Sequence, residues 1–167
     1  MLSFSTDIVI KGSRAKKYQE LKIRYGFELI DIFIISATLG FINKRKGVQE
    51  KDGDETANIP RNVLTSHERL IDEICEYIVL SEDLDAGEEE ALKTAFADSS
   101  QKDSKRLEKL ERFIDYSYGG IDILYDELVS DKYADAVDGM KNLLDKYLDK
   151  SSISTKTTEE IFEEYEL

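Results

Sequence analysis

Residues 28–43 read ELIDIFIISATLGFIN, a run that is apolar on nearly every side when drawn as a helix. Such a helix must be buried on most of its faces, either in the centre of its own domain or in a dimer interface. It is not predicted to cross a membrane. The apolar part, Phe27 to Ile42, is sixteen residues long and contains Glu28 and Asp31, whereas a membrane span needs about 20 apolar residues.

The preceding residues predict a short strand and a first helix. From Thr6 to Lys11, apolar and polar side chains alternate with the two-residue period of a half-buried strand, the one convincing strand pattern in the sequence. Ser13 is a suitable N-cap for the helix that follows, and Gly26 is a suitable end for it. The apolar positions of this helix recur at helical spacing: Ala15, Tyr18, Leu21 and Tyr25.

The rest of the chain predicts further helices. Residues 48–60 are a polar, glycine-containing loop that ends at the only proline, and residues 61–150 carry helical periodicity. We expect one domain of mainly α class, a bundle of about six to seven helices with one short N-terminal β-strand. Gly119 and Gly120 interrupt a helical pattern, where each costs about 1 kcal/mol relative to alanine. The pair predicts a kink or a close approach of two backbones.

Charge is distributed unevenly along the 167 residues. Residues 1–47, the basic head, carry nine basic and four acidic side chains, a balance of +5. Residues 48–167 carry 14 basic and 32 acidic side chains, a balance of −18, and their helical part, residues 61–150, is the acidic body. A functional account has to explain this split.

The sequence lacks the usual catalytic and metal-binding patterns. His67 is the only histidine, so the paired histidines of a metalloprotease helix are missing. Cys75 would lie about 12 Å from His67 along a helix, too far for a nucleophile pair, and cysteine and histidine alone cannot supply four zinc ligands. We read His67 as hydrogen-bonded or exposed and Cys75 as buried in the core. We predict a protein that is not an enzyme and has no cofactor and no metal.

The sequence also predicts the cellular compartment in which the protein resides. A single cysteine cannot form a disulfide within the chain, and this suits a reducing cytosol. Asp7 lies where a signal peptide would need an uninterrupted apolar core. We therefore expect a cytoplasmic protein.

Residues 5–43 have the order and spacing of a ribbon-helix-helix unit, in which strands from two chains pair and enter the DNA major groove. Asp7, Val9 and Lys11 would face the bases, a poor set because a carboxylate repels phosphate and valine offers no hydrogen bond. Nonspecific contact of the basic side chains with phosphates is better supported than the reading of bases. The candidate residues for contact with DNA or a partner are Lys11, Arg14, Lys16, Lys17, Lys22, Arg24, Lys44, Arg45 and Lys46. The segment either pairs in a homodimer or packs inside one chain.

Residues 151–167 predict a linker and a short acidic tail helix. Thr157 and Glu160 have capping-box spacing. The apolar face that follows, the candidate docking tail, lies among five glutamates and consists of Ile161, Phe162 and Tyr165. So short a helix is stable only when it docks, either on its own body or on a partner.

Two further runs resemble a known family. Residues 31–41 read DIFIISATLGF and are followed by Lys44 to Lys46 and then Ile59-Pro60, and residues 113–124 read FIDYSYGGIDIL. Over about residues 7–128 the chain resembles small proteins associated with the bacterial dnd DNA-phosphorothioation system. The resemblance implies an accessory protein encoded beside DNA-modification or anti-phage restriction genes, and it supplies no active site. The acidic stretch from Leu84 to Ser104 and the residues after Asp131 depart from the family.

Our leading hypothesis is a non-enzymatic accessory or adaptor protein that contacts a protein partner in such a complex. One alternative is a dimeric DNA-binding regulator of the ribbon-helix-helix type. Another is an acidic DNA mimic that occupies the basic channel of a nucleic-acid enzyme. The sequence leaves open whether DNA is contacted, and it predicts no membrane contact.

Overall fold

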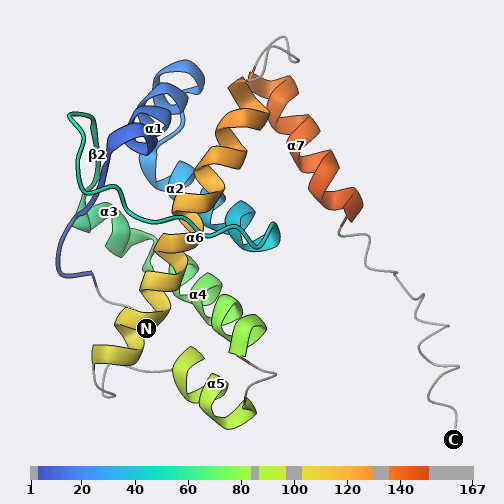
Figure 1. Cartoon of the computed structure of the whole chain (residues 1–167). Helices are drawn as coiled ribbons and strands as arrows, with labels where there is room; N and C mark the ends of the chain where they lie inside the picture. Colours follow the sequence, from blue (N-terminus) through green and yellow to red (C-terminus); the bar gives the residue numbers. More distant parts are fainter. Residues whose placement is uncertain (1–3, 84–86, 97–102, 130–135, 151–167) are drawn as a thin grey trace, which may run out of the picture. The chain divides into compact units, whose positions relative to one another are not determined.

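A computed structural model describes residues 4–83, 87–96, 103–129 and 136–150 (Figure 1). Within these ranges the chain is mainly helical, with one short antiparallel pair of strands, which confirms the predicted fold class. The elements in chain order are β1 (Ile8–Lys11), α1 (Gly12–Tyr25), α2 (Leu29–Ile42), β2 (Thr56–Ile59), α3 (Arg61–Ser66), α4 (Glu68–Asp83), α5 (Glu88–Ala95), α6 (Asp103–Val129) and α7 (Ala136–Lys150). The chain divides into two compact units, Met1–Asp126 and Glu127–Leu167.

The predicted strand is present and pairs within its own chain. β1 runs antiparallel to β2, with Ile10 opposite Ala57. Ile10 and Ala57 are fully buried, as the two-residue period requires. The antiparallel ribbon is thus made by one chain, as in the interpretation that packs residues 5–43 inside a monomer.

The strand β2 lies in the segment expected to be a loop. Only Ala57 and Ile59 are buried in its four residues, and a run this short has little β propensity of its own. Asp7, just before β1, also bonds to β2 and to the start of α3. Its carboxylate accepts hydrogen bonds from the Asn58 side chain at 3.0 Å and the Arg61 backbone N–H at 2.8 Å. These bonds lower the pKa of Asp7. The segment Thr56–Ile59 is a strand because it pairs with β1, which lies more than forty residues earlier in the chain.

The first helix ends as predicted and begins differently. Gly26 has φ 72° and closes α1 with its N–H bonded to the Lys22 carbonyl. Ser13 is not the N-cap, since α1 already begins at Gly12. Instead the Glu50 carboxylate accepts hydrogen bonds from the Ser13 N–H at 2.8 Å and the Ser13 hydroxyl at 2.6 Å. A carboxylate is favourable at this positive end of a helix, and these bonds lower the pKa of Glu50.

Helix α2 is buried inside its own unit, as one of the two sequence interpretations required. Ile32, Phe33 and Ala37 are fully buried. The Phe33 ring meets the Phe113 ring of α6 edge to face, with 5.2 Å between centroids. Such a pair adds to the free energy of burial because the positive ring edge faces the negative ring face.

Helices α2 and α6 touch through their backbones, and the adjacent glycines make this possible. A Cβ atom on Gly120 would lie 1.8 Å from the Ser36 carbonyl oxygen and 2.6 Å from the Gly40 nitrogen. A Cβ on Gly40 would lie 2.1 Å from the Tyr116 carbonyl oxygen. The glycine pair therefore marks a close backbone approach, one of the two predicted alternatives, and α6 continues through it as a single helix.

The chain leaving α2 crosses α6 at the same level (Figure 1). Its Gly47 N–H donates to the Asp115 carbonyl at 2.8 Å. A Cβ on Gly119 would lie 1.9 Å from the Arg45 carbonyl oxygen. The segment from Arg45 to Glu50 is thus a strap held directly on the α6 backbone.

A buried ion pair and a hydrogen bond from its lysine join α6 to α4 and α5. Lys109 of α6 is fully buried, and its Nζ lies 2.6 Å from an Asp72 carboxylate oxygen of α4 and 3.1 Å from the Ala95 carbonyl of α5. Removal of one partner from such a pair leaves an uncompensated charge. Sequence reasoning did not find this pair, because its residues are 37 positions apart.

The two residues considered for nucleophilic chemistry have structural roles. His67 lies between α3 and α4, and its Nδ1 is 2.9 Å from the Val63 carbonyl oxygen and 3.0 Å from the Ser66 hydroxyl. Cys75 is a buried free thiol, and burial raises its pKa. The structure confirms the predictions of a hydrogen-bonded histidine and a buried core cysteine.

The unit Glu127–Leu167 contains α7 among its described elements. Leu143 of this helix is buried, whereas Val137 and Leu144 are exposed. Lys146 forms an ion pair with Glu127. The candidate docking tail, Ile161, Phe162 and Tyr165, lies outside the described residues.

Replacement of Gly120 by alanine tests the contact between α2 and α6. Helix propensity alone predicts a gain of about 1 kcal/mol. The contact predicts the opposite sign, a loss of roughly 2 kcal/mol or more, because the new methyl group would meet the backbone of Ser36. Urea unfolding followed by circular dichroism measures the difference.

Gly87→Ala is the control for this change. A Cβ at Gly87 has no neighbour within 4 Å, so we expect a change below about 1 kcal/mol. A Gly120→Ala protein as stable as the wild type would mean that the two backbones are not in contact.

Candidate partner-binding surface

Three cations of the basic head converge on one carboxylate of the acidic body. Asp122 of α6 lies 2.6 Å from Lys17 Nζ, 3.3 Å from Arg45 Nη2 and 4.0 Å from Arg14 Nη2. The side chain of Asp122 is 20% exposed, so the surrounding water screens these attractions only in part. Positive charge of the basic head is thus paired with negative charge of the acidic body in the folded chain.

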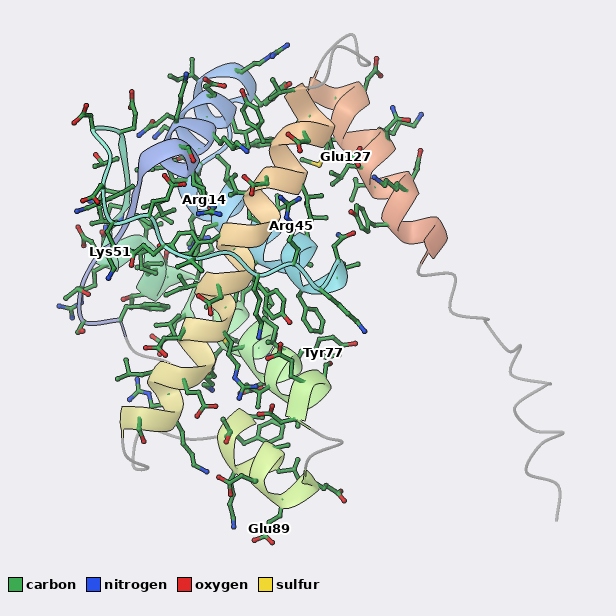
Figure 2. All side chains as sticks on the ribbon, in the orientation of Figure 1. Arg14, Arg45, Lys51, Tyr77, Glu89 and Glu127 are labelled. Atoms are coloured by element: carbon green, nitrogen blue, oxygen red, sulfur yellow. The ribbon has the colours of Figure 1, made fainter. Side chains whose placement is uncertain are left out.

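Arg14 is also held by backbone carbonyls. Its Nε donates to the Tyr118 carbonyl at 2.8 Å, and its Nη1 donates to the Val48 carbonyl at 2.7 Å. Glu50 of the strap lies 3.4 Å from the same Nη1. Arg14 therefore ties α1 to both α6 and the strap, and Figure 2 shows Arg14 and Arg45 against α6. Its guanidinium has a structural role.

Lys46 belongs to a second ionic cluster. Its Nζ lies 2.6 Å from a Glu82 carboxylate oxygen and 4.8 Å from the centre of the Tyr116 ring. The other Glu82 oxygen lies 3.2 Å from Arg112, which also pairs with Asp83 at 2.9 Å. Burial by itself would raise the pKa of Glu82, but hydrogen bonds from Lys46 and Tyr116 and the charges of Lys46 and Arg112 lower it overall.

The other candidate cations are more exposed. Lys16 lies 3.9 Å from Glu20 on the same helix, and Arg24 lies over the Tyr25 ring at 5.6 Å. The structure leaves three further candidates at exposed positions, Lys11, Lys22 and Lys44. It thus brings Arg14, Lys17 and Arg45 together and places Lys44 and Lys46 beside each other, but it does not gather the nine residues on one surface.

An open depression lies beside Lys44 and Lys46. Its volume is about 650 Å³, and its lining comes from the end of α2, the chain that follows it, α4 and α6. The lining residues are Phe41, Ile42, Lys44, Lys46, Ser81, Glu82 and Tyr116.

Phe41 and Tyr116 form one wall of this depression, and Tyr77, which is not among its lining residues, adjoins Phe41. The Phe41 ring meets the Tyr116 ring edge to face at 5.5 Å between centroids, and it meets the Tyr77 ring in the same way at 5.6 Å. Tyr77 projects from α4 (Figure 2) and is 64% exposed, and Ile42 is 51% exposed. We call Phe41, Ile42, Tyr77 and Tyr116, with the flanking Lys44, Lys46 and Glu82, the aromatic depression.

Sequence reasoning found the lysines of this surface but not its aromatic wall. Phe41 belongs to the apolar helix and Tyr116 to the run of residues 113–124, but neither pattern indicates a surface, and Tyr77 belongs to no motif. Three helices bring these rings together, so no local spacing in the sequence could have indicated them.

Comparison of the chain with protein-family models, with curated proteins and with solved structures finds no match. In the described part of the chain, no group of three or more His, Cys, Asp and Glu side chains could hold a metal ion. Within the same ranges, no single helix is long and apolar enough to cross a membrane. One pair, α1 with α2, meets the length and composition limits together but is bent by 117° at its break.

Replacement of Asp122 by asparagine tests the convergence of the three cations. The variant keeps a similar shape and loses the charge that Arg14, Lys17 and Arg45 share. We expect a loss of roughly 1 to 3 kcal/mol in unfolding free energy, since the group is partly buried. The loss should shrink at about 1 M salt, where screening is strong. Urea unfolding at two salt concentrations measures both effects.

Glu73→Gln is the control for this substitution. Glu73 pairs with Arg69 on one helix, and both side chains are exposed. Its loss should cost below about 0.5 kcal/mol. Equal costs for the two variants would contradict a special role for Asp122.

The lowered pKa of Glu82 predicts a pH dependence. Because the folded-state pKa lies below the ordinary value of 4.5, the ionised carboxylate stabilises the fold at higher pH. This contribution is lost as the pH falls below 4.5 and through the folded-state pKa. Glu82→Gln should therefore be most destabilising near pH 7 and approach the wild type near pH 3. Urea unfolding over a pH series measures the difference.

Glu76→Gln should behave in the opposite way. Burial and the nearby Asp72 raise the pKa of Glu76, so its ionised form disfavours the fold at neutral pH. Removing that charge should be neutral or stabilising near pH 7.

A constant difference between Glu82→Gln and wild type at every pH would show that the Glu82 charge has no net effect.

Proposed function

We propose that this protein is a non-enzymatic accessory or adaptor protein that acts by binding another protein. The observation that carries the proposal is the aromatic depression, where the exposed Ile42 and the adjoining exposed Tyr77 lie beside packed aromatic rings. Contiguous exposed apolar surface of this kind is typical of protein-binding sites. The resemblance to dnd-associated proteins supports a place in a bacterial DNA-modification or anti-phage defence complex, in the cytoplasm.

The ionic contacts favour protein binding over DNA binding. Arg14, Lys17 and Arg45 share Asp122, and Lys46 pairs with Glu82. Phosphate contact by these four cations would have to compete with carboxylates that are already in place. Nonspecific DNA binding depends on the number of cations that neutralise phosphates, so the pairing weakens the DNA-binding alternative.

Co-purification tests the proposal. The full-length chain, tagged and expressed in its native host, should recover a nuclease, an ATPase or a DNA-modification subunit in a fixed ratio. Recovery of the free chain alone would contradict an adaptor role. The same complex should persist after nuclease treatment, because we expect a contact between proteins and not a shared piece of DNA.

A direct DNA-binding measurement separates the main alternative. We expect no change in the fluorescence anisotropy of a labelled arbitrary duplex at about 50 mM salt, where phosphate contacts are strong. Binding that weakens steeply as salt rises would instead favour the regulator. Binding to a recovered nuclease that duplex DNA displaces would favour the DNA mimic.

A further inference from the structure

We infer that the aromatic depression binds an acidic segment of the partner protein, one that presents a large apolar side chain beside glutamate or aspartate. This inference rests on the proposed function and adds the site and the chemistry of the bound segment.

The apolar side chain is indicated by the shape of the depression. Phe41 stands edge to face with both Tyr116 and the adjoining Tyr77, so the wall rings Phe41 and Tyr116 are held in place by their neighbours. Ordered rings lose little conformational entropy when a ligand binds. Burial of the exposed parts of Ile42 and Tyr77 would then favour binding through the hydrophobic effect. A volume of about 650 Å³ is large enough for a bulky side chain and its neighbours.

The acidic flanks are indicated by charge. The lining has two lysines and one glutamate, on a chain whose net charge is −13. The glutamate, Glu82, already interacts with Lys46, Arg112 and the Tyr116 hydroxyl. Lys46 and Glu82 offset each other, so the positive charge left among the lining residues is that of the exposed Lys44, which an approaching carboxylate would meet. A basic segment would be repelled by the same lysine.

Lys44 is held at the edge of the depression by an unusual backbone conformation. It has φ 52°, and it is the one residue other than glycine with positive φ in the described part of the chain. Its N–H donates to the Phe41 carbonyl at 3.0 Å, and the next N–H, of Arg45, donates to the Gly40 carbonyl at 2.8 Å. These two bonds are the Schellman motif that ends α2, in which the residue after the C-cap takes the left-handed conformation. The motif fixes the backbone position from which an exposed lysine side chain starts.

The depression suits a protein segment better than a nucleic acid backbone. A phosphate chain needs a row of available cations. Of the two lysines in the lining, Lys46 is paired with Glu82. The aromatic wall would add nothing to a phosphate contact, whereas it matches the apolar side chain of a peptide.

The test uses the full-length chain and three fluorescein-labelled octapeptides. The first has a Leu-Phe pair flanked by three glutamates on each side. The second has lysine in place of every glutamate, and the third has serine in place of Leu and Phe. We expect saturable binding of the first peptide in fluorescence anisotropy and at least tenfold weaker binding of the other two. Absence of saturable binding of the first peptide, or equal binding of all three, would overturn the inference.

Matched double variants locate the site. Ile42→Ser with Lys44→Glu changes two exposed residues of the depression. Ile23→Ser with Lys22→Glu makes the same substitutions on the exposed face of α1, where Ile23 is 82% exposed. The first variant should bind the acidic peptide at least tenfold more weakly, and the second should remain within twofold of wild type. Circular dichroism checks that both variants are folded.

The same variants in the co-purification experiment separate the two proposals. If the double variant Ile42→Ser, Lys44→Glu loses the partner and the control double variant Ile23→Ser, Lys22→Glu keeps it, the result supports both the adaptor function and the assigned site. Retention of the partner by the Ile42→Ser, Lys44→Glu variant overturns the assigned site and leaves the adaptor function standing, whereas failure of the wild type to recover a partner overturns the function. A dimer in sedimentation that this variant converts to a monomer would show a second copy in the depression, and would overturn the inference.

Discussion

The direct contact between the backbones of α2 and α6 is the constraint on which the rest of the fold depends. Packed helices usually keep their axes 8–10 Å apart because side chains separate them. At Gly40 and Gly120 no side chain intervenes, and a single added carbon would meet a carbonyl oxygen. Each glycine within a helix costs about 1 kcal/mol of propensity. The close approach offsets this cost by letting large neighbours such as Phe33 and Phe113 meet ring to ring in the core.

The same approach decides where the charges lie. With α6 held against α2, α1 packs close enough for the buried Tyr18 hydroxyl to bond with the Ser117 hydroxyl at 2.7 Å. One helical turn further on, Asp122 meets Lys17, and the strap brings Arg45 to the same carboxylate. The basic head and acidic body are therefore partners in one folded unit. Four basic side chains of the head, Arg14, Lys17, Arg45 and Lys46, meet carboxylates of the acidic body in this way.

The aromatic depression is a consequence of the same geometry. The apolar run of α2 continues past Gly40, its contact with the α6 backbone, to Phe41 and Ile42. Phe41 finds ring neighbours on α4 and α6, while about half of Ile42 remains exposed. An apolar helix longer than the core that buries it thus leaves its end available to a partner, and this links the packing to the proposed adaptor function.

Local patterns in the sequence determined the mainly α class, the strand at Ile8–Lys11, the end of α1 at Gly26, and the burial of Cys75, because each depends on neighbours a few residues apart. The adjacent glycines also marked the close approach, though not what they approach. Only the tertiary structure decided that Thr56–Ile59 is a strand, that Glu50 serves the start of α1, and which carboxylates meet the basic side chains. Those contacts join residues roughly 40 to 105 positions apart. Such pairs are selected by packing and loop closure, which no short pattern records. The aromatic wall and the adjoining Tyr77 belong to the same group, since the three rings come from three helices that only the fold brings together.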